Sequence, residues 1–534
     1  MSFPLLTATA VLPAVGAIVT AAVPAARRTA AKWLALVFSL ATLVLAALVV
    51  VRFEPGGDRY QLTESHAWIP DFGVRYELGV DGIGVALLAL TALLIPFVIL
   101  AGWHDADPLE EVNPNRRWRP TQGFFALILM VEAMVILSFE ATDVFLFYIL
   151  FEAMLIPMYF LIGGFGDRAA PAQFAATAAG GGDEAAATQR SYAAVKFLLY
   201  NLVGGLIMLA AVIGLYVVAG SFSLSEIAEA RANGSLSIAT DIERWLFLGF
   251  FFAFAVKAPL WPLHTWLPNA MGEATAPVAV LITAVVDKVG TFAMLRFCLQ
   301  LFPEASKWAT PVILVLALIS IVYGALLAVG QRDMKRLIAY ASISHFGFII
   351  MGIFAMTSQG QSGATLYMVN HGISTAALML VAGFLITRRG SRLIADYGGV
   401  QKVAPVLAGT FLIGGLATLS LPGLSPFVSE FLVLVGTFSR YPVIGIIATI
   451  GIVLAALYVL VLYQRTMTGP VKAEVRTMPD LRVRELVVVT PLIALLLFLG
   501  VYPKPLTEIV NPAVEHTLSD VQQTDPKPEV EAAP

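Results

Sequence analysis

Long apolar runs recur along almost the whole chain, and they limit its fold more than any other feature of the sequence. About 20 consecutive apolar residues are enough to cross the hydrocarbon core of a bilayer as an α-helix. Dividing the chain at charged or Pro- and Gly-rich breaks gives about fourteen such runs. We therefore predict an all-α integral membrane protein with about fourteen transmembrane helices. The predicted spans are residues 4–24, 33–52, 80–103, 122–139, 144–163, 192–219, 243–269, 275–300, 309–330, 336–356, 364–386, 404–435, 442–464 and 485–503.

The composition supports this class and argues against others. Hydrophobic residues make up 58% of the 534 residues and charged residues only 13%, whereas soluble domains carry roughly 25% charged residues. The mean hydropathy is +0.83. The formal net charge of −3 gives no reason to expect nucleic acid as a partner. The surrounding lipid bilayer is the partner that the composition predicts.

The cysteine and histidine content argues against a metal or redox site. The single cysteine, Cys298, cannot form an intrachain disulfide, and it lies in an apolar stretch where we expect it to serve packing. No group of Cys or His residues has the spacing of a zinc, haem or iron–sulfur site. We therefore expect no cofactor in this chain, so that any redox cofactor belongs to another chain.

The distribution of lysine and arginine predicts how the chain is oriented. Loops after odd-numbered spans carry 21 of the 33 Lys and Arg residues, and loops after even-numbered spans carry nine with the tail included. Because cytoplasmic loops are enriched in positive charge, we expect both termini outside the cytoplasm. Arg27, Arg28 and Lys32 follow the first apolar run instead of preceding it, so we interpret that run as a transmembrane helix and not as a secretory signal.

Proline interrupts two of the predicted spans. Span seven is broken at residues 257–262 and span twelve at residues 421–426. Proline removes a backbone donor, and such a break survives in a membrane only where protein or water satisfies the freed groups. The breaks lie five spans apart, an odd offset that reverses the chain direction, which is typical of an inverted repeat. We expect two inverted five-helix repeats; the alternative is two proline kinks in a large bundle.

These spans divide the chain into segments. We expect helices 1–3 in residues 1–110, the first repeat (helices 4–8) in 120–301, the second repeat (helices 9–13) in 309–465 and the last helix in 484–503. The acidic tail, residues 519–534, has the composition of a disordered segment. Glu140 and Asp143 fall in a short outward loop, where we expect them to be solvated.

Charged residues inside the apolar runs carry the functional information. Glu152, Lys257, Lys288 and Glu430 all lie there. One charge at mid-depth in a bilayer costs at least ~2.5–3.5 kcal/mol, and a buried ionisable residue in a membrane helix is a functional candidate by default. Charges of both signs on several helices point to the movement of ions or protons. Lys257 and Glu430 also adjoin the two helix breaks.

Several long motifs in one order resemble a known family. FEAMLIPMYFLIG, FAVKAPLWPLHTWLPNA, QRDMKRLIAYASISHFGF, NHGIS and LPGLSPFVSEF are similar to the antiporter-like membrane subunits of proton-pumping NADH:quinone oxidoreductase, respiratory complex I. The resemblance covers roughly residues 75–505. The M-type subunits fit best, because Thr375 stands where L-type and Na⁺/H⁺ antiporter subunits carry a lysine, and Glu430 stands where the L and N types carry a lysine.

The resemblance implies a role for each charge. Glu152 on span five pairs with Lys257, and Lys288 is the central proton carrier. A buried ion pair is a poor stabilising device, so we interpret the Glu152–Lys257 pair as a switch. His345 and His371 form a proton wire, with His345 nearer Lys288 and His371 leading toward Glu430, the terminal site. Imidazole suits such a wire because it titrates closest to physiological pH.

Other positions have an accessory or open role, or depart from the family pattern. Glu132 in span four is an accessory candidate, and the roles of His264 and Asp287 stay open. The family often carries Asp and His where this chain has Asn269 and Met271. Asp287 directly before Lys288 is also unusual.

The implied function is proton translocation driven by redox chemistry in other subunits. FMN, iron–sulfur clusters, NADH and quinone are then expected in partner subunits, with L- and N-type subunits as neighbours in a bacterial inner membrane. Three alternatives remain open. They are a subunit of a multisubunit Na⁺/H⁺ antiporter, a membrane subunit of a hydrogenase-type complex, and a structural spacer with relic ion pairs.

Overall fold

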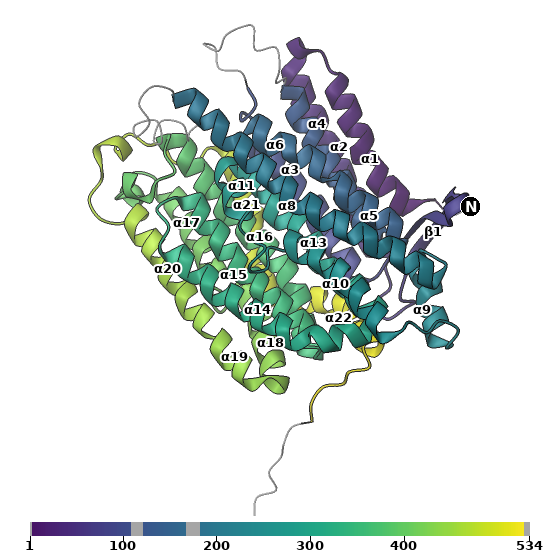
Figure 1. The fold of residues 1–534 in the computed structure, drawn as a ribbon. Coiled ribbons are helices and arrows are strands. Elements are labelled where there is room, and N and C mark those ends of the chain that lie inside the picture. The colour runs from purple at the N-terminus through teal and green to yellow at the C-terminus, as the bar shows by residue number, and fades with distance from the viewer. Residues whose placement is uncertain (1–2, 108–120, 167–181, 528–534) are drawn as a thin grey trace, which may run out of the picture.

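The computed structural model describes residues 3–107, 121–166 and 182–527. Most of them form helices that run side by side in one bundle (Figure 1). The first half contains α1 (Leu5–Ala22), α2 (Arg28–Arg52), α3 (Gly82–Ala101), α4 (Thr121–Glu140), α5 (Val144–Ala153), α6 (Leu155–Phe165), α8 (Gly182–Ala219), α9 (Leu224–Ala232), α10 (Thr240–Lys257), α11 (Leu267–Glu273), α12 (Ala276–Val280) and α13 (Asp287–Ala293). The second half contains α14 (Pro303–Val329), α15 (Met334–Phe354), α16 (Ser358–Arg389), α17 (Pro405–Thr418), α18 (Ser425–Arg440), α19 (Pro442–Ala448), α20 (Ile450–Met467), α21 (Val483–Val501) and α22 (Lys504–Asp520).

Twelve helical segments in the described part of the chain are long and apolar enough to cross a membrane. They match twelve of the predicted spans. The other two predictions are spans seven and twelve, which the structure divides into α10 with α11 and α17 with α18. Each is split because the backbone leaves the helix at the proline-rich break, so neither provides one long apolar helix. The total of fourteen and the inverted repeat therefore stay predictions.

The helical membrane fold class is confirmed, and one short segment that was not predicted is a β-hairpin. Residues Gln61–Ile69 (β1) and Val74–Val80 (β2) pair as an antiparallel hairpin. It lies between α2 and α3, at the same end of the bundle as α9 (Figure 1). The hairpin was not predicted because its strands, of nine and seven residues, are too short to form runs of membrane length.

Contacts between loops sort the helix ends into two groups. At one end, Lys32 pairs with Asp107 at 2.7 Å, and Arg392 pairs with Glu273 at 2.9 Å. At the other end, Arg59 pairs with Asp520 at 2.5 Å. The first group joins loops after odd-numbered spans, and the second joins loops after even-numbered spans. This grouping is what a chain that alternates its direction requires.

Side chains donate hydrogen bonds to the backbone at both helix breaks. After α10, Trp266 Nε1 donates a hydrogen bond of 2.9 Å to the carbonyl of Val256. At the first residue of α18, Asn370 Nδ2 donates one of 2.9 Å to the carbonyl of Ser425. At the α10 break, a protein group therefore replaces the backbone partner that the break removes, as a lipid environment demands.

The prediction of a disordered tail fails for its first half. α22 continues to Asp520, and Val521 is fully buried. Asp525 accepts hydrogen bonds from the backbone and hydroxyl of Ser358 at 2.8 and 2.5 Å. These contacts dock residues 519–527 on the ends of α16 and α18, which is why an acidic composition did not predict their structure. Residues 528–534 lie outside the described residues.

The centre of the bundle is formed by the segment from α12 to residue 299 together with α15 and α16. The segment Ala276–Leu299 and the apolar stretch of α16 are fully buried, and α15 is almost fully buried. Two π-helical turns flank α13, at Leu281–Val286 and Met294–Leu299. By contrast, α2, α20 and α21 expose many large apolar side chains, as a lipid-facing surface requires. The predicted site residues Lys288, His345 and His371 thus lie on the most enclosed helices.

Candidate functional site

Lys288 is joined directly to a histidine. Its Nζ lies 2.7 Å from Nδ1 of His371, and both residues are fully buried. The same Nζ lies 4.2 Å from the ring centre of Phe346, a cation–π distance. Lys288 reaches this position because the segment that precedes it, α12 with the π turn Leu281–Val286, packs against α16. The contact provides a direct route for a proton between an amine and an imidazole.

His345 follows His371 in the row. The two imidazole ring centres lie 5.2 Å apart, and His345 Nε2 lies 3.5 Å from the hydroxyl of Tyr458. The sequence analysis expected His345 nearer Lys288 and His371 nearer Glu430, and this order is wrong. The order differs because α16 packs against both the π turn before α13 and α15, so His371 lies between Lys288 and His345.

Glu430 is held by hydroxyl groups. Tyr367 donates a hydrogen bond of 2.7 Å to Glu430 Oε2, and Ser420 donates to the same oxygen. Tyr367 also lies beside His345, with ring centres 5.8 Å apart. Lys288, His371, His345, Tyr367 and Glu430 therefore form one series of neighbours, which we call the central row.

Sequence reasoning missed the two tyrosines. Tyr367 lies four residues before His371, so both are on one face of α16, and this spacing could have identified it. Tyr458 on α20 gave no such signal, because a lone tyrosine in an apolar helix is usually a packing residue. Ser420 lies at the break before α18, and this position is the only sequence signal that could have identified it.

Glu152 and Lys257 lie near each other without a direct ion pair. Lys257 is the last residue of α10, and its Nζ donates a hydrogen bond of 2.8 Å to the carbonyl of Phe151. It also lies 3.7 Å from the ring centre of Phe151. The Glu152 carboxylate packs against Gly205, where any larger side chain would collide with it. In this conformation the two charges are neighbours and their contact is open.

The remaining candidates lie away from the central row. Glu132 is fully buried on α4, and its carboxylate oxygens have no hydrogen-bond partner in the described part of the chain. His264 packs its ring against Tyr323 at 5.2 Å. Glu140 and Asp143 are fully buried, so the expectation of solvation is wrong. Asp143 caps α5 by accepting from the backbone of Phe145 and Leu146, which only the folded loop reveals.

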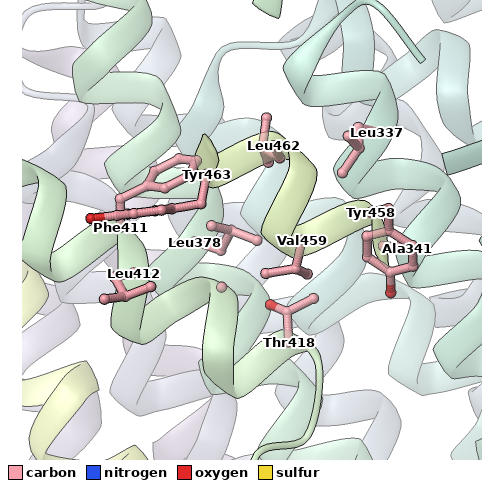
Figure 2. Close-up of a pocket in the computed structure, with 11 residues that line it drawn as sticks. Leu337, Ala341, Leu378, Phe411, Leu412, Thr418, Tyr458, Val459, Leu462 and Tyr463 are labelled. Carbon is pink, nitrogen blue, oxygen red and sulfur yellow. The ribbon is translucent and has the colours of Figure 1, made fainter. Parts of the chain in front are cut away.

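A small cavity reaches Tyr458, which neighbours the central row at His345. It offers about 10 Å³ to the centre of a water molecule, about the room that one water needs. Apolar side chains line most of it, with Thr418 and Tyr458 at one end (Figure 2). No residue of the central row is among its lining residues. No group of three or more His, Cys, Asp or Glu residues that could hold a metal occurs in the described ranges.

The chain is similar in sequence to known membrane subunits. The profile of the family described as NADH:quinone oxidoreductase/Mrp antiporter, TM, matches residues 182–455, more than half of the chain. NADH-quinone oxidoreductase subunit M of Mycobacterium tuberculosis (strain CDC 1551 / Oshkosh) is 55% identical over 97% of this chain and 95% of that protein. Subunit M of Rhodobacter capsulatus is 37% identical over 93% of this chain and 92% of that protein.

A solved structure extends the likeness to the fold. A chain of respiratory complex I from Thermus thermophilus with bound NADH superposes with a TM-score of 0.83 at 29% identity, over 97% of this chain and 99% of that chain. The motifs, the fold and relatives above 30% identity over nearly the full length all agree. The chain therefore belongs to the NADH:quinone oxidoreductase/Mrp antiporter transmembrane family and, within it, to the M-type subunits of respiratory complex I.

Proposed function

We propose that protons move through this subunit along the central row, from Lys288 through His371 and His345 to Glu430. As a member of this family, the chain is a proton-translocating membrane subunit of NADH:quinone oxidoreductase. The single observation that supports the path is the 2.7 Å contact between Lys288 Nζ and His371 Nδ1 in the enclosed centre of the bundle. A charged lysine placed there for packing alone would be costly.

Each member of the row can take one part of the transfer. The Lys288 ammonium donates to Nδ1 of His371, and the opposite ring nitrogen of His371 releases a proton toward His345. His345 passes it on through the hydroxyl of Tyr367 or Tyr458. A hydroxyl both donates and accepts, so Tyr367 transfers a proton without taking a net charge. Glu430 receives it through the 2.7 Å bond from Tyr367.

The Glu152–Lys257 neighbours would control this transfer. When their contact closes, the field of Lys257 at the centre of the bundle is partly compensated by Glu152, and when it opens the field acts unscreened. The open arrangement seen here, with Lys257 on the Phe151 carbonyl, is one of the two states that such a switch needs. Coupling between subunits then means that the charge pair of one subunit changes the equilibrium between the open and closed states of the pair in the neighbouring subunit.

We further propose that this chain performs no redox chemistry and lies between L- and N-type subunits. Its affinity purification from solubilised membranes should bring down a complex that contains FMN, iron–sulfur clusters and subunits of both types. Chemical cross-linking with mass spectrometry should place those two types next to this chain. Co-purification with only antiporter subunits or with hydrogenase subunits would replace this assignment by one of those alternatives.

The positive-charge bias makes a prediction about orientation. We expect both termini on the outer side, because 21 Lys and Arg residues lie in loops after odd-numbered spans and only nine lie in the others. In a Cys298→Ser background, cysteines introduced at Gly56 and Gln522 should react with an impermeant maleimide added outside intact cells. A cysteine at Ala395 should react only after the membrane is opened. The opposite labelling pattern would reverse the orientation.

A further inference from the structure

Asp287 is a buried carboxylate that the proposed path does not use. It begins α13 directly before Lys288, its side chain is fully buried, and neither oxygen has a hydrogen-bond partner within the described ranges. A lone carboxylate in such a place is tolerable only as the neutral acid or beside a cation. A residue of this kind exchanges between the two forms when a nearby cation gains or loses its proton.

Asp287 directly precedes Lys288 on α13, a helix that packs against α10, which ends at Lys257. Asp287 and Gly290 share a face of α13, since they are three residues apart. A side chain at Gly290 would lie 2.9 Å from the backbone nitrogen of Ala258, so this face meets the end of α10, where Lys257 sits. Lys288 itself points toward α16 and His371.

The backbone before Asp287 is also unusual. The π turn Leu281–Val286 ends at the residue that precedes it. π turns account for well under 1% of residues in soluble proteins, and single turns of this kind occur frequently at functional sites. The extra residue rotates everything after it by about 100° relative to an unbroken α-helix. The turn thus sets the directions in which Asp287 and Lys288 point.

We infer that Asp287 is a proton-transfer residue that connects Lys257 on α10 with Lys288 on α13. The carboxylic acid gives its proton to the Lys288 amine, which leaves a carboxylate beside an ammonium. The carboxylate then takes a proton from the Lys257 ammonium, which becomes the neutral amine. One proton moves in each step and no other reactant is needed. This inference rests on the proposed role of Lys288 and adds one step before it.

Asp287→Asn tests the inference because it keeps the shape of the side chain and removes its proton. In sealed vesicles that contain the intact complex, NADH-driven proton uptake should fall on the order of tenfold or more, the low end for losing a positioned proton-transfer group. Asp287→Glu should retain part of the uptake. Glu140→Gln, which also alters a fully buried carboxylate but lies away from the lysines, should pump normally. NADH oxidation with a soluble electron acceptor measures how much complex has assembled.

Infrared spectra separate proton transfer from a purely structural role. The band of a protonated carboxylic acid should disappear in Asp287→Asn and shift in Asp287→Glu. Normal uptake in Asp287→Asn alongside lost uptake in Lys288→Ala would overturn the role of Asp287 and leave the central row in place. Normal uptake in both variants would overturn both. If Asp287→Asn fails to assemble, an assembled Asp287→Glu complex with an unshifted acid band contradicts the inference, and a shifted band supports it.

Discussion

Lys257→Ala is expected to leave the complex assembled but to lower NADH-driven quinone reduction and proton pumping on the order of tenfold or more. Lys257 is almost fully buried, and its ammonium is held by the carbonyl and the ring of Phe151. Its removal leaves Glu152 without a counter-charge and deprives the centre of the bundle of the charge that acts on it. Glu152→Ala should have a similar effect, because it leaves the buried Lys257 ammonium without a neighbouring negative charge.

Two comparisons make this prediction specific. Lys32→Ala also removes a buried lysine, but this lysine pairs with Asp107 at one end of the bundle. The Lys32→Ala variant should therefore pump normally. The double variant Lys257→Ala with Glu152→Ala should not be worse than the sum of the single variants, because neither charge is then left alone. The measurement is NADH-driven acidification of sealed vesicles, normalised to assembled complex. Full activity in Lys257→Ala would show that the switch lies elsewhere.

The class of fold could be predicted because lipid restricts a chain so strongly. Unbroken apolar runs of about 20 residues have one stable solution, the helix. Twelve spans were predicted from this rule alone and are confirmed. The two breaks were visible because Pro259 and Pro426 cannot continue a helix. The four charges stood out for the same reason, since lipid makes them expensive.

The arrangement within the bundle could not be predicted, because it depends on packing between distant segments. The order of His345 and His371 is set by the packing of α16, which places His371 between Lys288 and His345. The open Glu152–Lys257 contact depends on side-chain conformations near the α10 break. Tyr458 reaches His345 only through the approach of α20, a helix that exposes many large apolar side chains. The hairpin at 61–80 and the burial of Glu140 likewise follow from contacts between loops.

The central claim is that Lys288 binds and releases a proton, and Lys288→Arg tests it most directly. Arginine keeps the positive charge but stays protonated at any physiological pH. The Lys288 ammonium lies 2.7 Å from His371, so a group that cannot release its proton should block transfer at that contact. Lys288→Ala should also lose pumping, because the carrier is absent. A fixed counter-charge, by contrast, would be replaced well by arginine.

The measurement is NADH-driven proton translocation in sealed vesicles of wild type, Lys288→Arg and Lys288→Ala. Each rate is divided by NADH oxidation with a soluble acceptor, which reports the assembled complex. We predict that both variants assemble and that both lose pumping on the order of tenfold or more. Pumping at the wild-type rate by Lys288→Arg, with Lys288→Ala inactive, would show that Lys288 is a fixed charge and would contradict the proposed path.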